Sequence, residues 1–138
     1  LTGNMLFAQK SQSKIDSLNL IINNLGSPDT SKAESYLELS ELLFSSNLDT
    51  VVPLCTHSLE IVERALASSP NSQTKSKLLE IKAMDYNNIG YILKKKGEKE
   101  KAIEYYQKAL KIDPTLINKI NNIRYFKLIL IFNPILVA

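Results

Sequence analysis

One stretch of the sequence, residues 83–114, constrains the fold more than any other. Its apolar and small residues recur every three or four positions, the spacing that places side chains on one face of a helix. The pattern is interrupted at Gly97. It ends at Pro114, because proline has no backbone N–H to donate and disfavours helix in the residue before it. The stretch therefore predicts two amphipathic helices joined by a tight turn.

Small residues in this stretch predict that the two helices pack closely. Gly90 lies inside the first helix, and Ala102 and Ala109 lie on the apolar face of the second. A glycine inside a helix costs roughly 1 kcal/mol relative to alanine, so its presence indicates that another backbone comes near. We therefore expect Gly90 to face the two alanines.

This order of residues resembles the tetratricopeptide repeat, a 34-residue helical hairpin with aromatic, small and proline residues at fixed positions. The matching residues are Tyr86, Ile89, Gly90, Leu93, Gly97, Ala102, Tyr106, Ala109 and Pro114. An ordinary antiparallel helix pair would share the apolar spacing but not the glycine and both alanines. The resemblance implies an all-α fold, a right-handed α-α superhelix of stacked hairpins.

The resemblance is weaker in the rest of the chain. Residues 31–69 repeat the pattern of 83–112 in degenerate form, which predicts about two full repeats with flanking helices. The first copy lies further from the second than the standard 34 residues, so we expect elongated helices between them. Such elongated repeats are similar to those of sensor proteins in bacterial signalling. Residues 115–132 begin a third copy and predict a terminal helix.

The length of 138 residues predicts one domain. We expect it to occupy residues 13–138, with a lone first helix over 13–25. Residues 1–12 predict either a disordered N-terminus or the remnant of a secretory signal peptide, because apolar residues precede a polar segment. The localisation is therefore left open between export to the periplasm and the cytoplasm.

Charge and residue counts exclude several classes of function. A net charge of +3 is small, and the lysines around Gly97 have no interleaved aromatic residues on which bases could stack, so we expect no nucleic-acid binding. One cysteine and one histidine allow no internal disulfide and few metal sites or catalytic triads. Because phosphate-loop and nucleophile motifs are also absent from the sequence, we expect no enzyme activity, cofactor or metal. The alternative is an enzyme-associated helical domain with no visible catalytic site.

The resemblance also implies a groove, lined by the first helix of each hairpin, that binds a peptide or a partner protein. The residues that it assigns to this groove are Leu37, Glu41, Phe44, Asn87, Tyr91, Lys94, Asn121, Tyr125 and Leu128. Surface or inter-helix packing is the alternative for each of them. As a set they mix apolar, amide and charged groups, which suits a protein segment better than a small molecule. We expect a protein-interaction scaffold, and the sensing region of a larger bacterial signalling protein is one form of it.

The C-terminal residues 124–138 contain more apolar surface than one preceding hairpin can cover. Exposed apolar patches of this size usually mark an interface. We expect a homodimer through this segment, with a missing downstream segment or a membrane as the alternative cover. The apolar run itself is shorter than the about 20 residues that span a bilayer.

Overall fold

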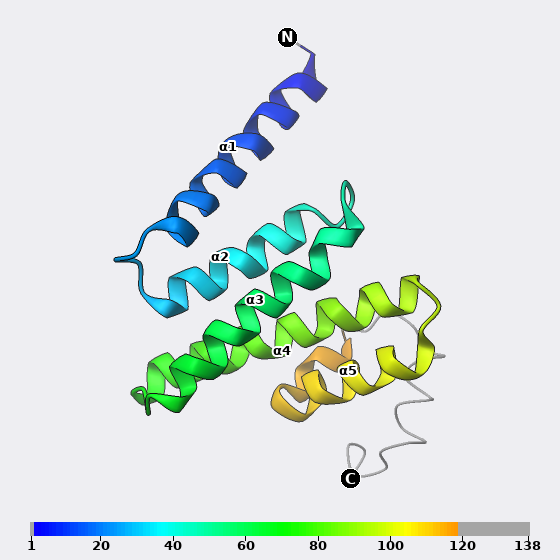
Figure 1. Cartoon of the computed structure of the whole chain (residues 1–138). Coiled ribbons are helices and arrows are strands. Elements are labelled where there is room, and N and C mark those ends of the chain that lie inside the picture. Colours follow the sequence, from blue (N-terminus) through cyan, green and yellow to red (C-terminus); the bar gives the residue numbers. More distant parts are fainter. Residues whose placement is uncertain (1, 119–138) are drawn as a thin grey trace.

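The computed structural model describes residues 2–118 and shows an all-α fold over this range, as the sequence predicted. Successive helices run antiparallel in a zigzag (Figure 1). The elements are α1 (Gly3–Asn23), α2 (Asp29–Leu42), α3 (Leu48–Ala67), α4 (Ser72–Lys95), α5 (Lys99–Ile112) and the 3-10 helix η1 (Pro114–Asn118). Of the predicted terminal helix over 115–132, only residues 115–118 are described, and they belong to η1. The remainder lies outside the described residues.

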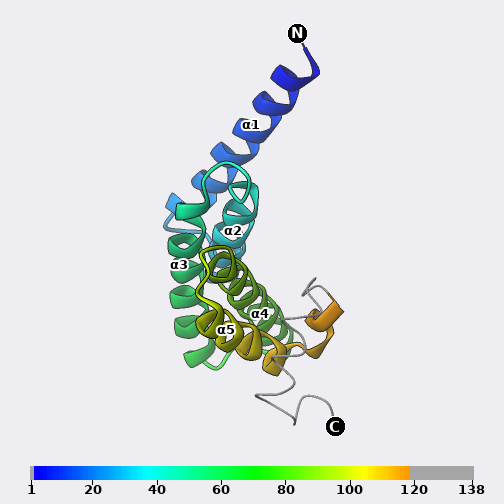
Figure 2. The same ribbon diagram turned by 90° about the vertical axis from the view of Figure 1, so that its right-hand side faces the viewer.

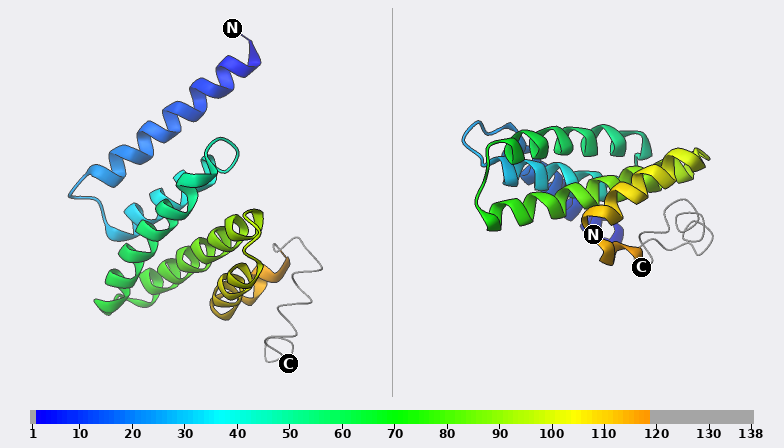
Figure 3. Two further views of the ribbon diagram at one scale, coloured as in Figure 1. Left: turned by 45° about the vertical axis from the view of Figure 1, so that its right-hand side comes forward. Right: turned by 90° about the horizontal axis from the view of Figure 1, so that it is seen from below.

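Two stacked hairpins make up the body of the molecule. Helices α2 and α3 form the first hairpin, and α4 and α5 form the second. Helix α4 packs against α3 on one side and α5 on the other, and it also contacts α2 (Figure 3). The turn between α4 and α5 depends on Gly97, whose φ of 82° is a left-handed conformation that glycine adopts without strain.

Gly90 lies where α4 and α5 approach each other closely. A Cβ atom at this position would lie 2.9 Å from Cδ1 of Tyr106 and 3.3 Å from the carbonyl oxygen of Ala102. Tyr106 is itself buried, so its ring has little freedom to move away. The expected close helix contact is therefore present, with Tyr106 as the nearest side chain.

Helix α4 is longer than the other described helices, at 24 residues. It begins after Asn71, whose side-chain oxygen accepts a hydrogen bond from the backbone N–H of Thr74 at 2.9 Å. Such an N-cap satisfies one of the N–H groups that have no partner inside the helix. Residues 72–82 thus extend the first helix of the second hairpin. Together with the greater length of α3 relative to α5, this extension explains the long spacing between the two copies.

Helix α1 begins at Gly3, whereas the sequence favoured a helix from residue 13 and an irregular segment before it. Residues 4–12 contain no proline or further glycine, and several of them are good helix formers, so the helix continues towards the N-terminus. Its N-terminal half stands clear of the other helices (Figure 2). Packing against α2 buries Leu18, and Lys14 Nζ lies 2.9 Å from Glu38 Oε2.

The core consists of three apolar clusters. The first cluster lies in the α4–α5 hairpin and includes Leu116 of η1. The second joins α2 to the C-terminal half of α3 and the N-terminal half of α4. The third joins α3 to the C-terminal half of α4. Helix α4 contributes to all three, directly or through partly buried side chains. No helix within residues 2–118 combines the length and hydropathy that a membrane span requires.

Candidate functional site

An aromatic pair joins the two hairpins at the surface. Phe44 follows the end of α2, and Tyr91 lies near the end of α4. Their ring centroids are 5.4 Å apart with the planes at 77°, an edge-to-face contact. Phe44 is half-buried against the third apolar cluster, whereas Tyr91 remains 37% exposed. The sequence predicted both residues for the groove, and the fold brings them together.

Lysines surround the exposed face of this pair. The Nζ atoms of Lys94 and Lys95 lie 5.9 and 5.4 Å from the centroid of the Tyr91 ring, within the range of cation–π attraction. Both occupy the last turn of α4, where a cation also complements the helix dipole. We call Phe44, Tyr91, Lys94 and Lys95 the aromatic–lysine patch.

An ion pair connects the end of α4 with the start of α3 beside this patch. Lys96 Nζ, at the end of α4, lies 3.3 Å from Asp49 Oδ1 in the first turn of α3. Both side chains are largely exposed to solvent, so the pair contributes little to the free energy of unfolding. The ion pair shows, however, that the end of α4 and the start of α3 lie on the same side of the molecule.

The other predicted groove residues have different places. Glu41 is exposed on α2, three residues before Phe44, and Asn87 is half-buried on α4, one turn before Tyr91. Leu37 is a correction: it is buried in the second apolar cluster, so its side chain supports the core and lines no open surface. Asn121, Tyr125 and Leu128 lie outside the described residues.

A cluster of polar side chains is buried at the junction of the first hairpin with α4. Its members are Ser40 on α2, Cys55 and Ser58 on α3, and Asp85 and Asn88 on α4. Asp85 is fully buried, and neither of its carboxyl oxygens has a hydrogen-bond partner among the described residues. Burial raises the pKa of Asp85 to about 8, and the Ser58 hydroxyl and the Cys55 thiol only partly oppose this.

Sequence reasoning did not single out Asp85, although a signal was present. Asp85 and Asn88 continue a row of residues spaced by three and four along one face of α4. The row contains Leu78, Ile81, Asp85, Asn88 and Ile92. An acidic residue inside such an apolar row indicates a buried carboxyl group. Lys95 was also missed, because the lysines around Gly97 were considered only as a surface for nucleic acid.

Two kinds of catalytic group, a reactive cysteine and a metal site, are absent from the described residues. Burial raises the pKa of Cys55 well above its ordinary value, so its sulfur stays a thiol and is a poor nucleophile. Within residues 2–118 no three His, Cys, Asp or Glu side chains are grouped to hold a metal ion.

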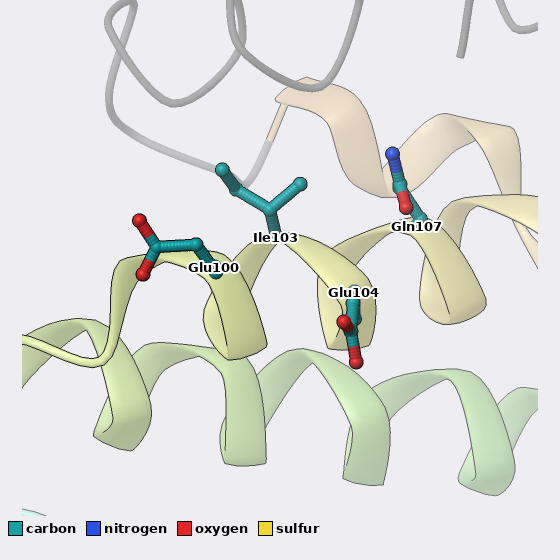
Figure 4. Close-up of a pocket in the computed structure, with 4 residues that line it drawn as sticks. All are labelled: Glu100, Ile103, Glu104 and Gln107. Atoms are coloured by element: carbon teal, nitrogen blue, oxygen red, sulfur yellow. The ribbon is translucent and has the colours of Figure 1, made fainter. Parts of the chain in front are cut away.

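A hollow of about 320 Å³ lies on α5, lined by Glu100, Ile103, Glu104 and Gln107 (Figure 4). All four residues come from one helix, so no second described element supplies a functional group to it. The described part of its lining is therefore a single face of α5.

Comparison with known proteins identifies a repeat family in one segment of the chain. A family model for the tetratricopeptide repeat matches residues 83–116, which comprise the last part of α4, the whole of α5 and the start of η1. No curated protein and no solved structure matches the chain. The matched segment is the hairpin in which Gly90 packs against Tyr106 and Ala102. Residues 83–116 thus form one tetratricopeptide repeat.

Proposed function

We propose that the chain is a protein-interaction scaffold that binds a segment of a partner protein at the aromatic–lysine patch. Tetratricopeptide repeats generally mediate protein–protein interaction, and domains built from them are typically non-catalytic scaffolds. The observation that carries the proposal is the contact of Phe44 with Tyr91 across the two hairpins. It supports a partly exposed aromatic surface near the C-terminal ends of the first helices of both hairpins, beside the groove that the resemblance implies.

The chemistry of the patch indicates which segment would fit. An exposed tyrosine ring offers a large, rigid contact surface for an apolar or aromatic side chain, and such residues often dominate binding energy. Lys94 and Lys95 place positive charge beside the ring. A partner segment with an apolar side chain next to an aspartate or glutamate would complement both features.

The test is to select peptides from a random display library on the immobilised chain and to measure their affinity by fluorescence anisotropy. We expect Tyr91→Ala to weaken binding roughly tenfold or more, because a central aromatic contact contributes more than about 1.4 kcal/mol. We expect replacement of Lys94 and Lys95 by glutamine to weaken binding mainly at low salt, where exposed charges are least screened.

Phe7→Ala is the matched control. Phe7 is an exposed aromatic residue, 75% accessible, on the part of α1 that stands clear of the other helices (Figure 2). Its removal should leave the affinity unchanged. Selected peptides that bind the Tyr91→Ala variant as tightly as the wild type would show that the patch is not the binding site. Circular dichroism of each variant verifies that the helices are retained.

Narrower predictions from the sequence remain proposals within this function. They are that the chain is the sensing region of a larger bacterial signalling protein, and that residues 124–138 join two copies in a homodimer. The apolar composition of that segment supports self-association. The elongation of α4 beyond the matched repeat supports the likeness to sensor repeats.

A further inference from the structure

The carboxyl group of Asp85 is buried at the junction between the first hairpin and α4, and it has no hydrogen-bond partner among the described residues. Asp85 faces α3, where the Ser58 hydroxyl and the Cys55 thiol already donate their protons elsewhere. The side-chain amide of Asn88, one turn later on α4, is buried without a hydrogen-bond partner, as the Asp85 carboxyl group is. The Ser58 hydroxyl donates to the carbonyl oxygen of Ala33 at 3.0 Å. The Cys55 thiol donates to Ser40 Oγ at 3.5 Å. Both groups lie close enough to lower the pKa of Asp85. In the described structure, however, neither of them donates to a carboxyl oxygen of Asp85, and both of these oxygens lack a hydrogen-bond partner.

The charged groups around the junction would not compensate a negative charge there. The titratable neighbours that act on Asp85 are Cys55 from α3 and Glu41 from α2, and neither is a cation. Lys82, one turn earlier on α4, pairs with Glu63 of α3 at 2.5 Å. Helix α5 lies on the other side of α4, and its Lys108 lies over the Tyr105 ring. An ionised Asp85 would therefore be an isolated buried charge, which is strongly unfavourable.

We propose that Asp85 is a proton-dependent latch: α4 packs against the first hairpin only while the Asp85 carboxyl group carries a proton, and loss of that proton opens the junction. Opening lets water reach the carboxylate and solvate its charge. The proposal concerns the closure of the fold, and it holds whether or not the aromatic–lysine patch binds a partner.

The direction of the pH dependence follows from the two states of the carboxyl group. In the open state its pKa is near the ordinary value of 3.8, and in the closed state burial raises the pKa to about 8. Between these values the closed state holds a proton that the open state has released, so rising pH favours opening. The effect is complete above about pH 8, where both states are ionised.

The same junction sets the geometry of the aromatic–lysine patch. Phe44 belongs to the first hairpin and Tyr91 to α4, so their contact crosses the surface that the latch holds closed. Opening would separate the two rings. The latch would thereby make the shape of the patch depend on pH near neutrality.

Cys55 provides a built-in reporter of the opening. It is the only cysteine of the sequence, it is fully buried, and its thiol belongs to the polar cluster around Asp85. The experiment measures the rate at which 4,4′-dithiodipyridine labels Cys55 in the full chain between pH 5 and pH 9. Each wild-type rate is divided by the rate of the Asp85→Asn variant at the same pH, so that the titration of the exposed thiol cancels.

We expect this ratio to rise about tenfold per pH unit between pH 5 and pH 7, as the release of one proton requires, and to level off above pH 8. Glu41→Gln is the control, because it removes the neighbouring acid and leaves Asp85 in place. It should retain the steep rise.

A ratio that does not change with pH overturns the proposal, and so does a Glu41→Gln variant whose profile is flat. Should Asp85→Asn fail to fold, Asp85→Ala replaces it in the ratio and the same rise is expected. As an independent measurement, the wild-type stability to urea should fall between pH 5 and pH 8. Constant stability over this interval contradicts the latch.

Discussion

At Gly90 the backbones of α4 and α5 lie so close that a methyl group would meet the Tyr106 ring. A Cβ atom would lie 2.9 and 3.0 Å from two carbons of that ring. The tyrosine is buried and has the backbone of Ala102 beside it, so the contact is relieved only by shifting the hairpin. One missing side chain thus sets the separation of two helices.

We expect Gly90→Leu to lower the free energy of unfolding by about 1–3 kcal/mol through overpacking, net of a gain of up to about 1 kcal/mol in helix propensity. Gly90→Ala should cost less. The matched control is Gly3→Ala in α1, where a Cβ atom would meet nothing within 4 Å, and where we expect no loss. Urea denaturation measures all three variants. A Gly90→Leu variant as stable as the wild type would contradict a close crossing at this residue.

Gly90 was predictable from the sequence, whereas Asp85 was not singled out. A glycine inside an amphipathic helix is costly in any fold, so local chemistry alone marks it. The burial of Asp85 depends instead on how α3 of one hairpin packs on α4 of the next, a contact between distant segments. The prediction that Leu37 lines the groove was wrong for the same reason, since the stacking of the helices decides which side of α2 faces the core.

Among the elements, α4 connects the whole array, and its N-terminus determines how far it extends. The Asn71 side chain caps this end by accepting a hydrogen bond from Thr74. Asn47 precedes α3 in the same way, but its side chain makes no capping hydrogen bond. The two asparagines therefore separate the effect of a cap from that of the residue type.

We expect Asn71→Ala to lower the free energy of unfolding by about 1 kcal/mol, because the loss of a cap leaves a helix N–H without its partner. Asn47→Ala is the control and should change the stability much less. Thermal unfolding followed by circular dichroism compares them. Equal losses in the two variants would show that the Asn71 side chain does not act as a cap.

The ends of the elements differ in how well local signals predict them. Gly97 and Pro114 bound α5 as expected, because a left-handed residue and a missing N–H act on the chain directly. The start of α1 had no such signal. Its first two turns contain neither a side-chain cap nor a buried residue, so only helix propensity favours them.

The described part of the molecule is a linear stack in which each helix packs mainly on its neighbours. Helix α1 contacts α2 at one end of the described chain, and α5 contacts α4 at the other. In such arrays stability is approximately a sum of local and nearest-neighbour contributions. A change confined to α1 should therefore have little effect on α5.

Leu18 tests this expectation, because it is the buried residue of α1, with 3% of its surface exposed. We expect Leu18→Ala to weaken the docking of α1 by up to about 2–5 kcal/mol and to speed amide hydrogen exchange there. Amide exchange in α5 should remain at the wild-type rate. Leu20→Ala is the control on the same helix, since Leu20 is 73% exposed and its removal should leave every helix unchanged. Faster exchange in α5 by the same factor as in α1 would instead mean that the chain opens as one cooperative unit, and that contacts through α2, α3 and α4 transmit the loss from one end to the other.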